Sequence, residues 1–142
     1  MTDTDRLARP TLRLAHAAAL EMVALAAAEA ERLSEPQCIT IVDTGGTVIA
    51  QIRMDGARLN ALAISETKAR TSASTRAPSG DEPLSVALAC GGRQTGLVGG
   101  LPIWLDGTHV GGIGVSSGPD EADLACARAA FALSPRLSAS AP

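Results

Sequence analysis

The chain has 142 residues, of which 46% are hydrophobic, and its formal net charge is −3. This length and apolar content suit one domain with a buried core. The 12 basic residues are scattered, and the aromatic residues are limited to Trp104 and Phe131, so neither a phosphate-binding stripe nor a base-stacking platform is expected. We therefore expect no nucleic-acid partner.

The cysteines and the N-terminal segment indicate in which cellular compartment the protein is expected. The three cysteines form no C-x-x-C pair and lie far apart, at Cys38, Cys90 and Cys126. Such cysteines are typical of small buried side chains in a reducing compartment, not of a disulfide framework or a zinc site. The alanine-rich start of the chain carries several acids and a histidine, so it is too polar for a signal peptide or a membrane span. We expect a soluble cytoplasmic protein with no membrane partner.

The first predicted element is a helix over residues 10–33. Its apolar residues recur at steps of three and four and form one stripe: Leu12, Ala15, Ala19, Met22, Ala26, Ala30 and Leu33. Pro36 stops any continuation of this helix. Residues 1–9 are expected to form a flexible N-terminus.

A β-hairpin and a second helix are predicted next. Residues 38–43 form a short β-branched strand, a glycine turn follows, and residues 47–55 return as a second strand. The pattern then predicts a helix over residues 60–74. A short helix is expected at residues 84–89, inside an otherwise irregular and glycine-rich stretch.

The second predicted hairpin is unusually rich in glycine. Its strands flank Asp106-Gly107, which is a strong signal for a two-residue turn. Closing that turn pairs residues by their distance from it: Leu105 with Thr108, Trp104 with His109, and Ile103 with Val110. Both faces of these strands are largely apolar, so we expect the sheet to be covered on both sides, by helices or by another subunit.

A last helix is predicted from Pro119, which suits the first helical position, and the acids of its first turn complement the helix dipole. Its expected buried stripe is Ala122, Ala125, Cys126, Ala129 and Leu133. Residues 135–142 are expected to be a flexible tail. The predicted fold class is α+β, a central antiparallel sheet built from hairpins with helices packed on it, in a single domain over residues 10–134.

Familiar catalytic motifs are incomplete. No GK[ST] follows Gly111–Gly114, and this run is neither a P-loop nor a dinucleotide-binding turn. Gly114–Gly118 matches G-x-S-x-G, but no histidine follows His109 to complete a triad. His16 and His109 are too far apart for a local metal-ligand spacing.

Lys68 is the only lysine in the chain. No acid lies three or four positions from it, so a local helix ion pair does not explain it. It either enters a pocket, as a charge for a carboxylate or as an amine that acts as base or Schiff-base nucleophile, or it is a solvated surface side chain. The residues leave both interpretations open.

Two other positions can be interpreted either as ligand-binding sites or as purely structural features. His16 lies next to the apolar stripe, one turn after Leu12, as a candidate axial haem ligand or a simple boundary residue. Ser116–Gly118 leads into a helix N-terminus, whose N–H groups can receive an anion or carboxylate. The acids that follow oppose anion capture and favour a simple helix cap.

Four fragments, in chain order, carry a resemblance to a known family. They are R-M-D-G-A from Arg53, A-x4-K-A-x-T from Ala63, G-G-x-P-I-x2-D-G from Gly99, and V-G-G-I-G-V-S from Val110. Together they are similar to the GlcG/HbpS family, whose domain also forms the C-terminus of PduO. The resemblance implies a small α+β domain with a central antiparallel sheet that assembles into dimers or larger homo-oligomers.

Members of that family are associated with haem or corrinoid-related binding. The resemblance therefore implies a small-molecule-binding accessory protein with haem or another tetrapyrrole as its ligand, and His16 as the candidate ligand of the haem iron. Positions where the backbone comes close to a ligand are expected at one end of the sheet, at Gly99, Gly100, Gly112, Gly114 and Ser116.

Two alternatives remain beside the binding interpretation. One is a small catabolic enzyme, an isomerase, tautomerase or hydrolase, that acts on a carboxylate- or carbonyl-bearing metabolite. Lys68 would then hold or activate the substrate, with Asp55 or Asp120 as general acid/base. The other is an oligomeric scaffold domain without chemistry.

Overall fold

The computed structural model describes residues 3–142. Its elements are α1 (Asp3–Leu7), α2 (His16–Arg32), β1 (Cys38–Val42), β2 (Val48–Arg53), α3 (Leu59–Thr75), α4 (Leu84–Ala89), β3 (Gly100–Leu105), β4 (Thr108–Ser116), α5 (Asp120–Ala129), the 3-10 helix η1 (Ala130–Leu133) and β5 (Leu137–Ser138).

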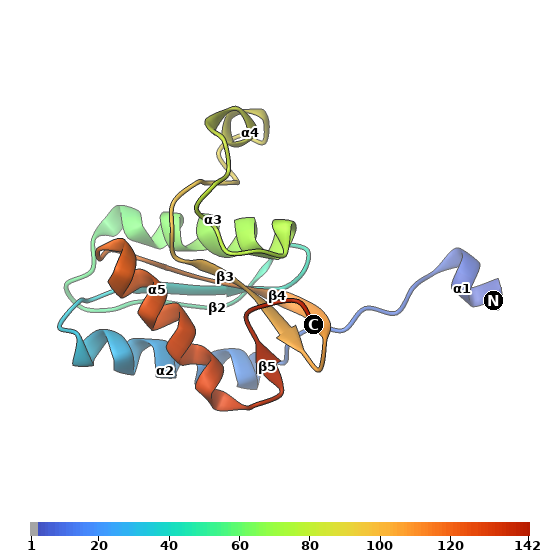
Figure 1. The fold of residues 1–142 in the computed structure, drawn as a ribbon, viewed down its shortest axis with the longest axis horizontal. Helices are drawn as coiled ribbons and strands as arrows, with labels where there is room; N and C mark the ends of the chain where they lie inside the picture. Colours follow the sequence, from blue (N-terminus) through green and yellow to red (C-terminus); the bar gives the residue numbers. More distant parts are fainter. Residues whose placement is uncertain (1–2) are drawn as a thin grey trace.

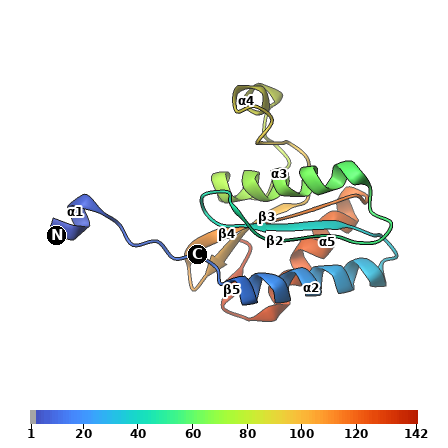
Figure 2. The same ribbon diagram turned by 180° about the vertical axis from the view of Figure 1, so that it is seen from behind.

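One sheet of five strands, in the order β2-β1-β4-β3-β5, organises the domain, and every strand pair is antiparallel. Helix α3 covers one face of the sheet, while α2 and α5 cover the other (Figures 1 and 2). This confirms the predicted α+β class, with a central antiparallel sheet and helices on both faces. β1 is buried along its whole length because both helical layers cover this inner strand.

The larger core lies between the sheet and the layer formed by α2 and α5. It is made of aliphatic side chains from both layers, among them Met22, Val23, Ile39, Ile41, Ile103, Ile113 and Val115. Burying one large aliphatic side chain contributes about 1.5–3 kcal/mol relative to leaving it exposed. The stability of the domain therefore rests mainly on this side of the sheet.

On the other face, glycines bring α3 unusually close to the strands. A Cβ atom at Gly114 would collide with the backbone oxygen of Ser65, and one at Gly112 would collide with that of Ala69. Gly100 faces the helix backbone in the same way. The glycine-rich hairpin is thus explained by helix packing, because glycine alone leaves room for a second backbone at this distance.

The first long helix is shorter than predicted. It begins at His16 instead of Pro10, and residues 8–15 are not helical. Leu12 is 50% exposed, so this part of the apolar stripe has no core to stabilise a helix. Helix α1 falls within residues 1–9, which were expected to be flexible, and it lies away from the body of the domain (Figure 1).

The C-terminal hairpin has the two predicted pairs next to its turn and then shifts register. A bulge between Ile103 and Trp104 places Ile103 opposite Gly111 instead of Val110. A Cβ atom at Gly111 would collide with the backbone oxygen of Val42. The predicted pairing of Ile103 with Val110 was wrong because a bulge depends on the neighbouring strand as well as on the turn.

Part of the expected tail is a strand. Leu137–Ser138 forms β5, which pairs with the end of β3. Leu137 is 9% exposed, and Arg136 Nε donates to Asp106 Oδ2 at 2.9 Å. One buried leucine and one ion pair across the turn hold this segment on the sheet, and neither is visible in a local pattern of Ser, Ala and Pro.

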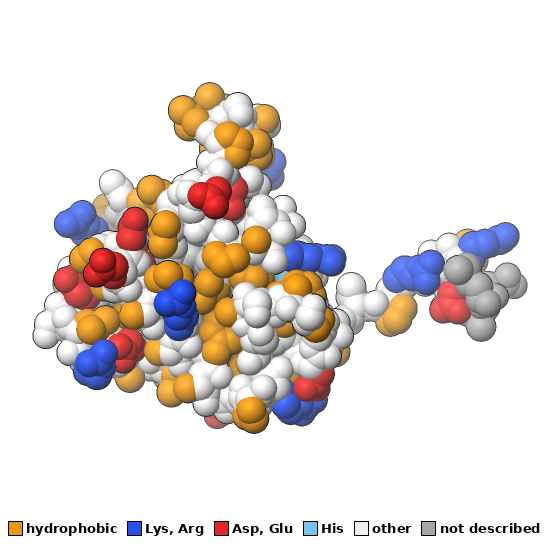
Figure 3. All heavy atoms as spheres, viewed as in Figure 1, with side chains coloured by type: hydrophobic (Ala, Val, Ile, Leu, Met, Phe, Trp, Pro, Cys, Tyr) orange, Lys and Arg blue, Asp and Glu red, His pale blue; other side chains and the backbone are white. Residues whose placement is uncertain are grey.

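Helix α4 stands out from the domain on the segment that follows α3 (Figure 1). None of its side chains is buried, and Leu84 and Leu88 are each 73% exposed. Hydrophobic side chains gather over this projection in the space-filling view (Figure 3). A helix of six residues has little stability of its own, so this arm is an apolar surface without a partner inside the domain.

Candidate functional site

A pocket of about 520 Å³ lies where α3 begins, β4 ends and α5 begins. Polar residues from all three elements line it, including Arg58, Asn60, Lys68, Ser116, Asp120 and Asp123. We call it the Lys68 pocket. The structure therefore brings together three of the predicted site residues: Lys68, Ser116 and Asp120.

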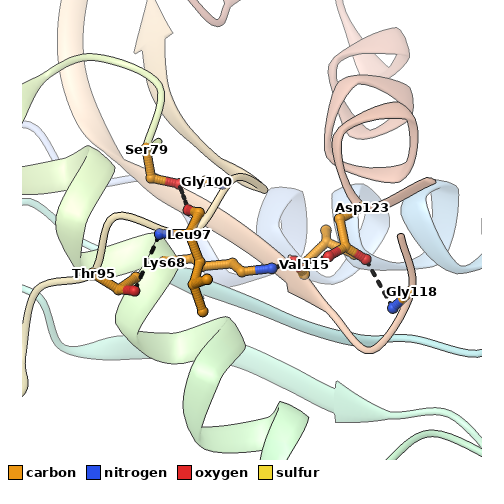
Figure 4. A network of polar contacts seen from close by, with 8 residues as sticks. All are labelled: Lys68, Ser79, Thr95, Leu97, Gly100, Val115, Gly118 and Asp123. Carbon is orange, nitrogen blue, oxygen red and sulfur yellow. Dashed lines mark hydrogen bonds and ion pairs between the residues drawn. The ribbon is translucent and has the colours of Figure 1, made fainter. Parts of the chain in front are cut away.

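Lys68 forms a buried ion pair with a residue from another element. Its Nζ donates to Asp123 Oδ2 at 2.9 Å and to the backbone oxygen of Val115 at 2.8 Å (Figure 4). Both side chains of the ion pair are 3% exposed. An ammonium group has three N–H donors, and these bonds use two of them.

The lysine stem needs space that Gly99 provides. A Cβ atom at Gly99 would come within 2.9 Å of Lys68 Nζ and 3.1 Å of Lys68 Cδ. Gly99 also has a φ of +129°, a conformation that glycine adopts with little cost. Of the predicted binding glycines, this one supports the lysine. Gly100, Gly112 and Gly114 face the backbone of α3, which leaves no space for a ligand on that side.

Asp123 is held from several sides. Its Oδ1 accepts from the backbone N–H of Gly118 at 3.0 Å. Burial raises the pKa of the Asp123 carboxyl, and the bond from Lys68 opposes that rise. The fully buried amide of Gln37 lies nearby, but neither of its polar atoms has a hydrogen-bond partner among residues 3–142. Removing one member of a buried ion pair is costly, because the other charge is left unpaired.

Three further polar side chains in the pocket are unused. Within residues 3–142, the side chains of Arg58, Asn60 and Asp120 make no hydrogen bond or ion pair. The remaining wall is apolar and includes Leu59, Ile64 and Leu97. A small molecule with one polar end and a short apolar body suits this combination.

Two residues of the turn before α5 already form hydrogen bonds. Ser117 Oγ accepts from the backbone N–H of Arg58 at 3.0 Å, which joins this turn to the start of α3. The N–H of Gly118 is already bonded to Asp123. That amide is therefore not available to an anion, although the N-cap residue of α5 is Pro119 and no side chain caps the helix.

Asp55 lies elsewhere. It is exposed in the turn after β2 and lines a groove between that turn and the end of α2, together with Glu31, Glu35 and Arg53. The structure does not place Asp55 with Lys68, so the predicted pairing of these two residues at one site is wrong. Asp120 is the acid that shares the pocket with the lysine.

His16 is at the opposite end of the domain from the Lys68 pocket. It is exposed in the first turn of α2, while the C-terminal end of α2 leads to Gln37 beside Asp123. A helix of this length, 17 residues, spans about 25 Å. The two candidate sites are therefore separate.

Asp123 was not among the predicted site residues, because it was counted with the acids that complement the helix dipole. The buried face of α5 and η1 is Asp123, Cys126, Ala127 and Ala130, about one residue away from the predicted stripe. These positions have the spacing of one helix face. An aspartate on that face requires a buried cation, and the single lysine of the chain is the obvious candidate.

The other polar predictions have simple outcomes. His109 packs against Trp104 with ring centroids 5.1 Å apart, and burial lowers its pKa. Cys38 and Cys126 are buried, Cys90 is half-buried, and all three are free. No cluster of metal-ligating side chains occurs among residues 3–142, and no helix there has the length and apolar character of a membrane span.

The fold is that of a small α+β domain in which helices cover both faces of a five-stranded antiparallel sheet. A family model described as "Haem degrading protein HbpS-like" matches residues 14–132. The chain therefore belongs to the HbpS-like family, as the sequence fragments predicted.

Individual relatives agree with this assignment. Protein GlcG of Escherichia coli K12 is 34% identical over 100 residues, which cover 67% of this chain and 75% of GlcG. A crystal structure of a PduOC:heme complex has a TM-score of 0.83 and 25% identity, over 91% of this chain and 99% of that one. A crystal structure of HbpS has a TM-score of 0.77 and 30% identity, over 88% and 92% of the two chains.

Proposed function

We propose that this protein is a small-molecule-binding accessory protein that binds haem or another tetrapyrrole through His16. The observation that carries the proposal is the exposed imidazole of His16, in a chain whose fold matches that of a haem complex over 91% of its length. The free cysteines are consistent with a reducing, cytoplasmic location.

The surroundings of His16 fit a flat apolar group. Leu20, Ala24 and Ala28 follow it at steps of four along α2, and all three are exposed. Residues at this spacing share one helix face, so a strip of small apolar side chains extends from the imidazole. Haem would supply an iron that a histidine nitrogen can bind. His16 would hold that iron, and the strip would offer an apolar surface to the rest of the group.

A hemin titration of the purified protein tests this proposal. We expect a saturable Soret shift that His16→Ala weakens or displaces, because the axial nitrogen is lost. His109→Gln is the matched control, since His109 is half-buried against Trp104; it should keep the native spectrum. A titration of His16→Ala that coincides with that of the native chain would exclude His16 as the ligand.

The Lys68 pocket supports a second candidate function. Its specific observation is a buried lysine that shares a pocket with the carboxylate of Asp120, which has no partner in the described part of the chain. We propose that an isomerase or tautomerase acting on a carboxylate- or carbonyl-bearing metabolite would use Lys68 to hold the substrate oxygen. Asp120 would move the proton next to the carbonyl.

Proton exchange in D2O tests the second candidate without a known substrate. Pyruvate is the probe, and proton NMR follows the loss of its methyl signal. Asp120→Asn should slow protein-dependent exchange about 100-fold, while Asp55→Asn, a matched change outside the pocket, should have no effect. Equal rates with and without protein would count against this function and leave the haem proposal untouched.

A further inference from the structure

A second polar pocket, of about 310 Å³, lies on the α3 side of the sheet. Three segments form it: the β1–β2 turn at residues 44–46, α3 at residues 70–74, and the segment 90–94 that follows α4. We call it the arginine pocket. Neither His16 nor any residue of the Lys68 pocket lines it.

The pocket carries positive charge only. Its lining holds two arginines, Arg70 and Arg93, and no acidic residue, although the chain has 15 acids and a net charge of −3. Neither arginine takes part in an ion pair among residues 3–142. Asp43, in the same turn, is not part of the lining, and its Oδ1 accepts from the amides of Gly45 and Thr47.

Arg70 is held in place, but only some of its hydrogen-bond donors have an acceptor in the described chain. Its Nη1 donates to the backbone oxygen of Gly46 at 2.8 Å. The guanidinium lies against that glycine, where a Cβ atom would come within 3.1 Å of Arg70 Cζ. Arg70 Nε is fully buried and has no hydrogen-bond partner in the described chain. Protein atoms cover this Nε, so an oxyanion would bind Arg70 through Nη2, which is not fully buried and has no acceptor among residues 3–142.

Arg93 is held by its own segment of the chain. Its Nε donates to the backbone oxygen of Cys90 at 2.9 Å, and its terminal nitrogens have no partner among residues 3–142. The segment that carries it is joined to α3, because Thr71 Oγ1 accepts from the N–H of Thr95 at 3.0 Å. The two guanidinium groups are thus held by separate elements before any ligand arrives.

We propose that the arginine pocket binds a phosphate group, either as the free ion or on a small phosphorylated metabolite. Two guanidinium groups match the charge and the several oxygens of a phosphate dianion, and planar guanidinium binds such oxygens in pairs. The hydroxyls of Thr44 and Ser74, also in the lining, make no hydrogen bond among residues 3–142 and can donate. The absence of a competing carboxylate lets the ligand supply the whole negative charge.

Cys90 provides a readout at the pocket itself. It lines the pocket and is half-buried. Cys38 and Cys126 are fully buried, and burial raises the pKa of both thiols, that of Cys126 to about 11. Alkylation by iodoacetamide near neutral pH therefore reports on Cys90, and a ligand in the pocket should slow it.

The experiment titrates inorganic phosphate, glycerol phosphate and glycerol at constant ionic strength, by calorimetry and by the rate of Cys90 alkylation. We expect saturable binding of at least one phosphate compound, protection of Cys90 and no effect of glycerol. Tighter binding of glycerol phosphate would identify a metabolite site, and tighter binding of inorganic phosphate a site for the free ion.

Matched arginine variants locate the binding. Arg93→Gln should weaken phosphate binding about tenfold or more, and its exposed position keeps the fold intact. Arg128→Gln, an exposed change on α5 outside the pocket, should bind like the native chain. The proposal is overturned if phosphate neither binds saturably nor protects Cys90, or if Arg93→Gln binds as tightly as Arg128→Gln.

Discussion

At the scale of single residues, the buried pair of Lys68 and Asp123 is the most consequential feature. It joins α3 to α5 across the end of β4. Its cost in lost hydration is offset only while both charges are present and hydrogen-bonded. The pair therefore connects the two helices at the wall of the Lys68 pocket.

The energetics of this pair can be tested by a double-mutant cycle. Lys68→Met should lower the free energy of unfolding by about 3–5 kcal/mol, because Asp123 is left as a buried, unpaired carboxylate. Lys68→Met with Asp123→Leu should recover most of that loss. Urea unfolding of the native chain, both single variants and the double variant measures the coupling. A double variant no more stable than Lys68→Met would contradict this account.

At the scale of elements, the close contact between α3 and the sheet governs the architecture. Glycines on β3 and β4 face the helix backbone, and α3 supplies residues to both polar pockets. The distance between helix and sheet therefore sets the positions of Lys68 and Arg70 together. A change in this packing should disturb both pockets.

Gly114→Ala tests the close contact. The added Cβ would collide with the backbone of Ser65 and Ala69, so we expect the free energy of unfolding to fall by about 1–3 kcal/mol or more. Gly45→Ala is the control, because its Cβ would meet only Asp43 Oδ1, at 3.4 Å. Thermal or urea unfolding compares the two, and equal stabilities would refute the packing explanation of the glycines.

At the scale of the whole molecule, the α4 arm leaves large apolar side chains in water. Leu84 and Leu88 are each 73% exposed, and grouped apolar side chains of this kind mark interaction surfaces. Because the family resemblance implies oligomers, we propose that this arm contacts a second copy of the chain.

Light scattering after size-exclusion chromatography tests the assembly. We expect a dimer or larger oligomer from the native chain and a smaller species from the double variant Leu84→Asp and Leu88→Asp, since burying aspartate without a partner is unfavourable. Leu7→Asp changes a leucine that is 79% exposed on α1 and should leave the assembly unchanged. A native chain that is monomeric at every concentration, or an arm variant that assembles like it, would argue against this role.

The sequence by itself determined the two hairpins, the sheet covered on both faces and the absence of a local ion-pair partner for Lys68. These follow from turn chemistry, from periodicity and from neighbours within one helical turn, all of which are local. The family fragments were also readable without a structure, and they identified the HbpS-like family.

Only the tertiary structure decided which residues meet. The partner of Lys68 is 55 positions away in Asp123, Asp55 lies in a different groove, and the glycines face α3. The arginine pocket combines three segments that no local pattern connects. Contacts of this kind depend on the distance and register between packed elements, and those are properties of the assembled core rather than of any one stretch of sequence.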